Sequence, residues 1–442
     1  MFIVIDSFRA DRFFGKKKTA KTPNIDLLIK QGSYFNNSIT TSDFTKPAMQ
    51  SIFTAKNPVG CGDLNDNYYY KLLSEESNLL KILKKNNYHL FGTMENILCL
   101  EGLNKEMENA DAGFKDTLNL HNGLEEKILS KIDEIQIHES WFYYIHLMDL
   151  HRPCSVPEDF VNLSLSERYD FNLTTIDTFI GKILNKIDLK NTLIVITGDH
   201  GEYMSPYDNY TGKQDNASST EKALKSTLKL FIPKSYRTSI HVKKKKVVTK
   251  IKQSQVQSPH EKRMFKTRPM PDRMLFDDVV RVPLVMSGYG IEKHSIINQQ
   301  TRSIDIFPTI FDLLNFDYPQ KVVGISLKNL LEGKITEQNV AYMESAVTQN
   351  YKEIPKPVVG IRTDKFKYFR SLTNPEKIVN LYDLENDPLE DNNLAEINLE
   401  LVKDFEKTLS DLRQNKDLQS SDEISLDEKT ELEEELKKLG YI

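Results

Sequence analysis

The alternation of short apolar runs with segments of helical periodicity constrains the fold of this chain more than any other feature. Apolar runs of strand length occur at 2–5 (FIVI), 141–147 (WFYYIHL), 192–197 (TLIVIT) and 282–287 (VPLVMS). Between these runs the apolar residues recur at helical spacing, as they do over 169–187. This order predicts an α/β fold, in which a mostly parallel sheet is flanked by helices.

The pattern of apolar and polar residues changes near residue 338, which predicts a second, smaller unit. Short apolar runs separated by polar turns are typical of an antiparallel sheet, and the last residues predict a charged amphipathic helix. We therefore expect a large domain over 1–335 and a C-terminal subdomain over 336–442. Residues 205–271, rich in Lys, Ser, Thr and Gln, predict an insertion. It is a solvated, lysine-rich surface or, alternatively, a lid or basic patch for a polyanionic substrate.

Composition excludes several classes of protein. The net charge of -5 over 442 residues argues against a general nucleic-acid binder, which would carry a basic surplus. The three cysteines, Cys61, Cys99 and Cys154, form no CxxC pair and are expected to be reduced thiols. We find no leader segment and no apolar run of the ~20 residues that a membrane helix needs. These observations predict a protein without a membrane span that is either cytoplasmic or begins before residue 1 of this sequence.

Acidic and imidazole side chains follow two of the predicted strands. Asp6 comes directly after 2–5, and Asp199 and His200 come just after 192–197. In an open α/β sheet, ligands bind beyond the carboxyl ends of the strands, and acids gathered there need a cation between them. Two oxygen donors with one nitrogen and no thiolate favour Ca, Mg or Mn, with catalytic zinc as the alternative. The sequence predicts one divalent metal ion at this edge.

A third strand end carries further titratable groups. His146, Asp149 and His151 lie at or just beyond the end of the run at 141–147. A single acid at such a position is usually a turn or capping residue. Together with the predicted metal ligands, however, these side chains would converge on the same edge of the sheet.

The stretch SDFTKPAMQSIFT (42–54) supplies a hydroxyl. Thr45 precedes Lys46 and Pro47 and an apolar-periodic segment, which predicts Thr45 as the N-cap of a helix. Capping alone explains a threonine. The start of a helix also directs N–H groups and a positive dipole end at whatever lies in front of it. Beside a metal ion, the hydroxyl of Thr45 could instead act as a nucleophile.

Several motifs, in order, resemble those of one known family. They are VIDSFRADRFFG, FTKPAMQSIFTAKNP, IHLMDLHRP, VITGDHGE and LFDDVVRVPLVMSG, followed by GIRTDKFKYFRS and LYDLENDPLEDNNLA. Over almost its whole length the chain resembles the sulfatase branch of the alkaline-phosphatase-like superfamily. The resemblance implies the α/β fold and the C-terminal subdomain expected above, and hydrolysis of an ester of an inorganic acid.

The resemblance also implies roles for individual residues. It assigns the metal to the three strand-end residues, Asp6, Asp199 and His200, and the position of the nucleophile to Thr45. His151, in the HRP triplet, would contact the leaving group or the transferred anion, and His146 is a weaker candidate for the same role. Arg273 lies close to the place of a basic residue before LFDD.

Three positions depart from the family pattern. Thr45 stands where sulfatases carry the Cys or Ser that becomes formylglycine, Met49 replaces an arginine, and Ser7 follows Asp6 where many members have a second acid. A threonine ester of phosphate is easier to resolve by a second in-line attack than a threonine ester of sulfate.

The sequence therefore predicts a metal-dependent hydrolase of sulfate or phosphate esters that uses a threonine nucleophile. Two alternatives remain open: a transferase that passes a phospho group to an acceptor hydroxyl, and a binding protein on an inactive scaffold. The expected partner is an anionic ester of a sugar, a lipid head group or another small molecule, and not a nucleic acid.

Overall fold

The computed structural model describes most of the chain. The described residues are 1–58, 78–100, 102–114, 118–204, 258–264, 274–319, 321–334, 336–345 and 357–414, together with residues 430 and 434. The predicted insertion is thus described only at 258–264. Most of the predicted terminal helix, Cys61 and Arg273 lie outside the described residues.

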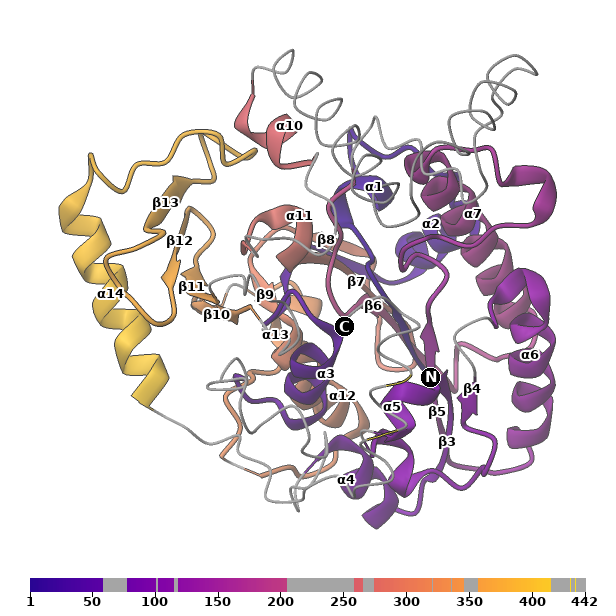
Figure 1. Cartoon of the computed structure of the whole chain (residues 1–442). Coiled ribbons are helices and arrows are strands. Elements are labelled where there is room, and N and C mark those ends of the chain that lie inside the picture. The colour runs from indigo at the N-terminus through magenta and orange to yellow at the C-terminus, as the bar shows by residue number, and fades with distance from the viewer. Residues whose placement is uncertain are drawn as a thin grey trace, which may run out of the picture.

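Nine of the described strands form one large sheet (Figure 1). They are β1 (Phe2–Ile5), β2 (Ser33–Ile39), β3 (His89–Glu95), β4 (Gly113–Phe114), β5 (Trp141–Leu147), β6 (Leu193–Gly198), β7 (Arg281–Gly288), β8 (Ser295–Ile297) and β9 (Thr301–Arg302). The order is β4-β3-β5-β1-β6-β7-β2-β8, with β9 paired to β2. Strand β7 runs antiparallel to both of its neighbours, and the remaining pairs are parallel. The predicted mostly parallel sheet is confirmed.

Helices cover both faces of this sheet (Figure 1). One layer packs on the face that carries Ile3 and Ile5 of β1, and the other on the face that carries Phe2 and Val4. The first layer contains α1 (Ala10–Phe13), α2 (Pro23–Gln31), α6 (Leu124–Ile135) and α7 (Leu165–Leu184). The second contains α3 (Thr45–Thr54), α4 (Leu79–Lys85), α5 (Asn96–Leu100), α12 (Ile306–Leu314) and α13 (Lys328–Leu331). Burial on both faces explains why the central strands are uninterrupted apolar runs.

Short 3₁₀ turns and two further helices complete the large domain. The turns are η2 (Leu103–Glu106), η3 (Leu120–Asn122), η4 (Glu158–Phe160) and η5 (Ser303–Asp305), and the helices are α10 (Pro259–Met264) and α11 (Asp277–Val280). Helix α10 is the described part of the predicted insertion. Arg263, in its last turn, is buried and donates to the Leu389 and Glu390 carbonyls of the C-terminal part of the chain. That part of the insertion therefore packs against the C-terminal part of the chain.

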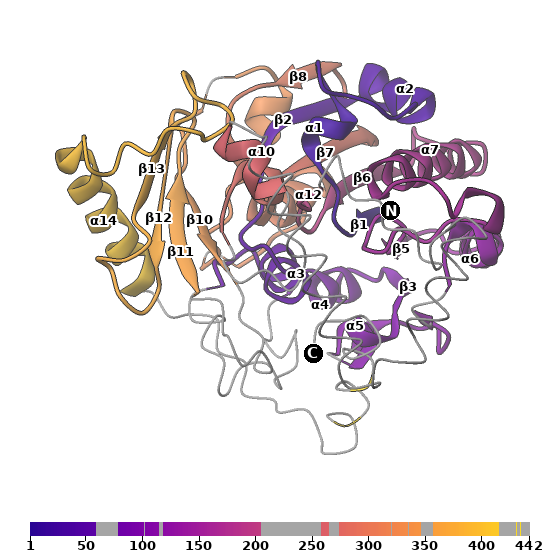
Figure 2. The ribbon, with the colours of Figure 1, turned by 45° about the horizontal axis from the view of Figure 1, so that its top comes forward.

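A separate antiparallel sheet forms the C-terminal subdomain, as predicted (Figure 2). Its strands are, in order, β10 (Ala341–Glu344), β11 (Val358–Arg362), β12 (Phe366–Ser371) and β13 (Asn380–Asp383), and α14 (Leu399–Gln414) packs on one face. The other face meets the large domain around Phe276 and Phe369. There Arg362 and Lys367 both form ion pairs with Asp277.

None of the helices in the described part of the chain combines the length and the apolar character needed to cross a lipid bilayer.

Candidate active site

The ends of two adjacent parallel strands bring the predicted metal ligands together. Strand β1 lies beside β6 with Ile5 opposite Gly198, so the next residues, Asp6 and Asp199, leave the sheet at the same level. Asp6, Asp199 and His200 are fully buried. One potential ligand atom from each lies within 4.8 Å of the others. The sheet edge thus gathers two carboxylates and one imidazole, as the strand-end rule predicts.

Hydrogen bonds orient both carboxylates. The Ser7 hydroxyl donates to Asp6 Oδ1 at 2.6 Å, and the backbone N–H groups of Ser7 and His200 donate to Asp199 Oδ1 at 3.1 and 2.7 Å. The Ser7 backbone has a φ of 60°, in the left-handed region, and from this conformation one residue bonds to both acids. Asp199 Oδ2 is buried and has no hydrogen-bond partner among the described residues.

The tautomer of His200 suits a metal ligand. Its Nδ1 lies 2.7 Å from the Gly201 carbonyl oxygen. Because a carbonyl oxygen can only accept, Nδ1 carries the proton and Nε2 carries the lone pair. A bond from the second ring nitrogen to a backbone carbonyl is the usual support for a metal-binding histidine. Only glycine fits at position 201, since a Cβ there would lie 2.2 Å from the Asp278 carbonyl oxygen.

The electrostatics of the two acids also fit a cation. Burial alone would raise the pKa of Asp6, but His151, His200 and His146 hold it well below its usual range. Burial and the adjacent charge of Asp6 raise the pKa of Asp199 to about 6. Two buried carboxylates therefore lie close together, and a hard divalent ion would satisfy both, including the unpartnered Oδ2 of Asp199.

Thr45 lies at this cluster, and its predicted role as an N-cap is wrong. Helix α3 begins at Thr45, its N-cap is Phe44, and no side chain caps it. The Thr45 hydroxyl instead donates to Asp6 Oδ2 at 3.1 Å and lies 3.4 Å from His200 Nε2. The hydroxyl is thus directed at a carboxylate of another element, and a hydrogen bond to a charged acceptor is stronger than one between neutral groups.

The two histidines of the third strand end also lie near the acids. His146 and His151 are buried, and both are close enough to shift the pKa of Asp6. Asp149, from the same segment, has a different environment: it accepts a hydrogen bond from Leu120 N at 3.0 Å, and its carbonyl bonds to Asn172. The structure therefore brings His146 and His151 to the cluster of Asp6, Asp199, His200 and Thr45, whereas the carboxylate of Asp149 bonds to Leu120 instead.

Comparison with known proteins identifies the family. A family model described as Sulfatase matches residues 1–316. The chain belongs to the sulfatase family. A second model, N-sulphoglucosamine sulphohydrolase, C-terminal, matches residues 266–415.

Named relatives of this chain include two from bacteria. The Delta 4,5-hexuronate-2-O-sulfatase of Bacteroides thetaiotaomicron is 31% identical over 126 residues, which cover 27% of this chain and 25% of that protein. The match therefore spans a quarter of that relative's length. The Ulvan-active sulfatase of Formosa agariphila is 21% identical over 453 residues, covering 89% of this chain and 76% of that protein.

Solved structures share the fold of this chain. The phosphonate monoester hydrolase of Agrobacterium radiobacter has a TM-score of 0.63 at 17% identity, covering 93% of this chain and 95% of that one. A protein solved in complex with its substrate D-glucosamine-2-N,6-O-disulfate has a TM-score of 0.62 at 15% identity, covering 94% of this chain and 98% of that one.

The sequence-based prediction missed one residue of the candidate site. Tyr144, on β5, is fully buried, and its hydroxyl lies 2.7 Å from Nδ1 of His146. Residues two apart on a strand share a face, so the alternation in WFYYIHL could have pointed to this pair. Which atom the hydroxyl bonds to, however, could not be read from the spacing.

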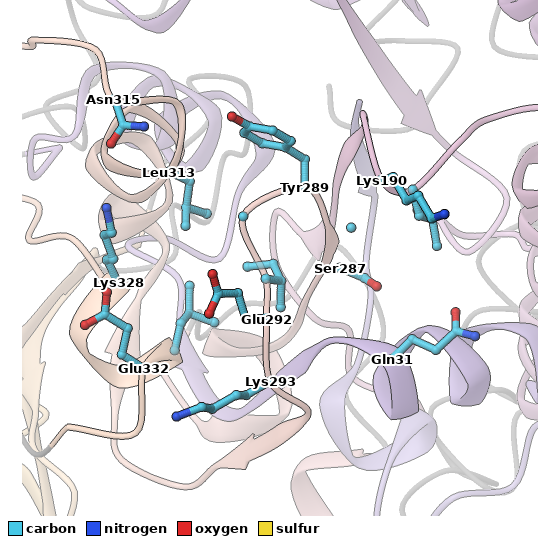
Figure 3. A pocket seen from close by; sticks show the side chains of 15 residues that line it. Gln31, Lys190, Ser287, Tyr289, Glu292, Lys293, Leu313, Asn315, Lys328 and Glu332 are labelled. Atoms are coloured by element: carbon cyan, nitrogen blue, oxygen red, sulfur yellow. The ribbon is translucent and has the colours of Figure 1, made fainter.

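A large cavity lies away from the acids, at the opposite edge of the sheet, and Figure 3 shows the side chains that line it. It has a volume of about 770 Å³ and lies beside Gly288, the last residue of β7, which pairs with Leu193, the first residue of β6. Its charged lining includes Lys293, Lys328 and Glu292, and none of its lining residues is a histidine. The groups suited to ester chemistry are at the carboxyl edge.

Proposed function

We propose that this sulfatase-family chain is a metal-dependent hydrolase of sulfate or phosphate esters with Thr45 as its nucleophile. One observation carries the proposal: the Thr45 hydroxyl donates to Asp6 Oδ2 at 3.1 Å and lies 3.4 Å from His200 Nε2. A short alcohol side chain thus lies at the start of a helix, directly beside the carboxylate and imidazole that fit a cation.

Asp6, Asp199 and His200 would hold the metal. Their atoms converge within 4.8 Å, and Asp199 Oδ2 is a buried acceptor with no partner among the described residues. A divalent ion bound there would supply positive charge for the ester oxygens and lower the pKa of a neighbouring hydroxyl. The oxygen-rich donor set favours Ca, Mg or Mn over Zn.

The reaction takes place at Thr45 in two displacements. In the first, the proton of the Thr45 hydroxyl passes to its acceptor, Asp6 Oδ2, while Oγ1 forms a bond to the sulfur or phosphorus atom of the ester and the bond to the substrate's alkoxy oxygen breaks. His151 gives a proton to that alkoxy oxygen, so the substrate leaves as an alcohol. In the second, water gives a proton to His151 and its oxygen attacks the same central atom; the bond to Thr45 Oγ1 breaks, Oγ1 takes back the proton from Asp6, and the inorganic anion is released. N–H groups at the start of α3 face the developing charge.

The relatives favour sulfate esters, and in particular sulfated sugars. The names of two relatives specify a hexuronate 2-O-sulfatase and an ulvan-active sulfatase, and a structural neighbour was solved with a sulfated glucosamine. We therefore propose an anionic sugar ester as the first substrate class to test.

Phosphate or phosphonate esters are a second candidate, which the residue type at position 45 favours. A threonine cannot become formylglycine, whose hydrate releases sulfate by elimination, so the covalent ester on Thr45 must be resolved by attack of water. That route suits phosphorus, because the transferred phosphoryl group is loosely bonded to both the attacking and the leaving oxygen in the transition state. A phosphonate monoester hydrolase among the structural neighbours is consistent with this reading.

The test compares three variants of the metal-loaded protein on aryl sulfate, aryl phosphate and aryl phosphonate esters. Thr45→Ala should retain bound metal, measured by elemental analysis, and lose turnover by several orders of magnitude on the substrate that the wild type prefers. Thr45→Ser should retain part of the activity. Thr54→Ala is the matched control, because Thr54 lies on the same helix and its hydroxyl bonds only to Gln50 O in the helix itself.

The outcomes separate the proposal from its alternatives. Turnover that depends on an added alcohol would indicate a transferase. A wild type that binds metal but turns over none of the three ester classes, with or without an alcohol, would indicate a binding protein. Full activity in Thr45→Ala would refute a covalent role for Thr45 while leaving the metal site intact.

A further inference from the structure

Tyr144 and His146 form a buried pair on β5, on the side of the sheet that α3 covers. Both side chains are fully buried, and their Oη and Nδ1 atoms lie 2.7 Å apart. They lie two residues apart on β5, so they share the face of the sheet that carries Phe2 and Val4. Val4 pairs directly with His146. The pair therefore lies on the face that α3 covers.

The position of α3 places this pair beside the nucleophile. Thr45 and Met49 are one helical turn apart and so share a face of the helix. Met49 Sδ lies 3.9 Å from Tyr144 Oη, while Thr45 Oγ1 bonds to Asp6. The imidazole of His146 is close enough to Asp6, His200 and His151 for each to shift its pKa.

The hydrogen-bond partners of Tyr144 decide the tautomer of His146. The phenol can donate to the imidazole nitrogen at 2.7 Å or to the thioether of Met49 at 3.9 Å. A thioether is a weak acceptor and the longer contact is poor, so the proton of the phenol lies toward Nδ1. Burial and the charges of Asp199 and Asp6 raise the pKa of Tyr144 well above 10, which keeps the hydroxyl protonated as a donor. His146 must then carry its own proton on Nε2.

His146 Nε2 is an unpartnered buried group. It has no hydrogen-bond partner among the described residues, although the side chain is 0% exposed. Burial lowers the pKa of His146 to about 4, so the ring is neutral near pH 7. A buried N–H without an acceptor is unfavourable, and an oxygen of an anion bound in front of Thr45 would satisfy it.

We propose that Tyr144 is a positioning residue: its hydroxyl donates to Nδ1 of His146 and so presents Nε2–H as a fixed, uncharged donor to one oxygen of the bound anion. This inference rests on the proposed function in one respect: the proposed function places an anion in front of the Thr45 hydroxyl. It assigns to His146 a different role from that of a proton donor, since a neutral imidazole fixed in this way binds the anion without giving up a proton.

The test reads the tautomer and anion binding without turnover. Protein labelled with ¹⁵N-histidine and loaded with metal is studied by long-range ¹H–¹⁵N spectra, and the His146→Gln spectrum assigns the signal. The probes are inorganic sulfate and inorganic phosphate, titrated separately. The wild type should show neutral Nε2–H for His146, and that signal should move on titration with at least one of the two anions.

In Tyr144→Phe, the Nε2–H tautomer of His146 should no longer be the only one populated, and anion binding should be weaker. We expect Nδ1–H to become populated and the affinity to fall about 10- to 100-fold, the effect of one hydrogen bond to a charged acceptor. Tyr143→Phe is the matched control: Tyr143 is the next residue on β5, equally buried, and its hydroxyl bonds to Thr93 at 2.6 Å. It should leave both readouts unchanged.

A rescue variant separates positioning from simple packing and guards against misfolding. Glutamine places an N–H donor near the position of Nε2, so His146→Gln should bind the anion nearly as well as the wild type does. The double variant with Tyr144→Phe should then bind no more weakly than His146→Gln alone. His146→Leu should lose binding whether or not Tyr144 is changed.

Three results would overturn the inference: an Nδ1–H tautomer in the wild type, an unchanged tautomer in Tyr144→Phe, or loss of binding in the double variant beyond that of His146→Gln. If no ester is turned over but the tautomer and the anion affinity respond as expected, the proposed hydrolase function fails and the assignment of Tyr144 stands.

Discussion

The hydroxyl of Thr45 lies 3.1 Å from Oδ2 of Asp6, a residue 39 positions earlier in the chain. The contact joins the first residue of α3 to the end of β1, so it depends on the packing of a helix against the sheet edge. A threonine that only capped its helix would bond to that helix. The observed contact instead makes Thr45 part of the cluster that fits a cation.

The first prediction concerns the metal. Asp199→Asn removes a charged oxygen from the cluster and should lower the affinity for Mn²⁺ or Ca²⁺, measured by calorimetry, by more than the about 10- to 100-fold that the loss of an outer-shell partner costs. Asp26→Asn, which changes a carboxylate paired with Lys18 at the surface, should bind the metal as the wild type does. Full metal affinity in Asp199→Asn would place the metal elsewhere.

The second prediction concerns pH and Asp149. Burial raises the pKa of this carboxyl to about 6, from 3.8. The folded protein therefore binds the proton more tightly than the unfolded chain, and the unfolding free energy falls as the pH rises from about 4 to about 6. Asp149→Asn removes this loss and should be about 3 kcal/mol more stable than the wild type at pH 7, with little difference near pH 4.

Chemical denaturation at several pH values measures this effect. Asp159→Asn is the control, because Asp159 is exposed and its substitution should leave the pH dependence unchanged. If Asp149→Asn and the wild type lose stability in parallel between pH 4 and 7, the carboxyl is charged in the folded protein and the prediction is wrong.

The third prediction concerns the contact between the two domains. Arg362 and Lys367 hold the pKa of Asp277 well below its usual range, against the effect of burial. Its carboxylate is 17% exposed, so Asp277→Asn should destabilise the protein by about 3 kcal/mol, the low end for breaking a buried ion pair.

The pH dependence of this effect has the opposite sign to that of Asp149. The Asp277 carboxylate contributes stability above its unfolded pKa, and that contribution is lost as the pH falls through the folded pKa. Thermal unfolding of Asp277→Asn and wild type should therefore differ most at neutral pH and converge in acid. Asp312→Asn is a control on α12, and an equal loss in both variants would show a nonspecific effect.

The central strands and the grouping of the acids could be predicted from the sequence, because both depend on the order of residues within short segments. The runs at 2–5 and 141–147 are buried on both faces, so unbroken apolar character marks them as central strands. Asp6 and Asp199 follow from the rule that parallel strands end at one edge. The predicted fold and the grouping of the acids needed no knowledge of side-chain packing.

Other features depend on contacts between distant segments. Strand β7 runs antiparallel to β6 and β2. An apolar run predicts a buried strand but does not indicate the direction in which that strand runs. Thr45 begins its helix rather than capping it, and its hydroxyl bonds to Asp6 of another element, a contact that the spacing of residues 42–54 does not reveal. Tyr144 was not identified because its bond to His146 distinguishes it from any other buried tyrosine only once the two side chains are placed.

The most direct measurement of the central claim is mass spectrometry of the protein quenched during turnover of its preferred ester. The account predicts a sulfuryl or phosphoryl group covalently attached to Thr45 in the metal-loaded wild type, and no such group in Thr45→Ala or in the metal-free protein. Turnover at the normal rate with Thr45 unmodified, or with the group attached to another residue, would contradict it.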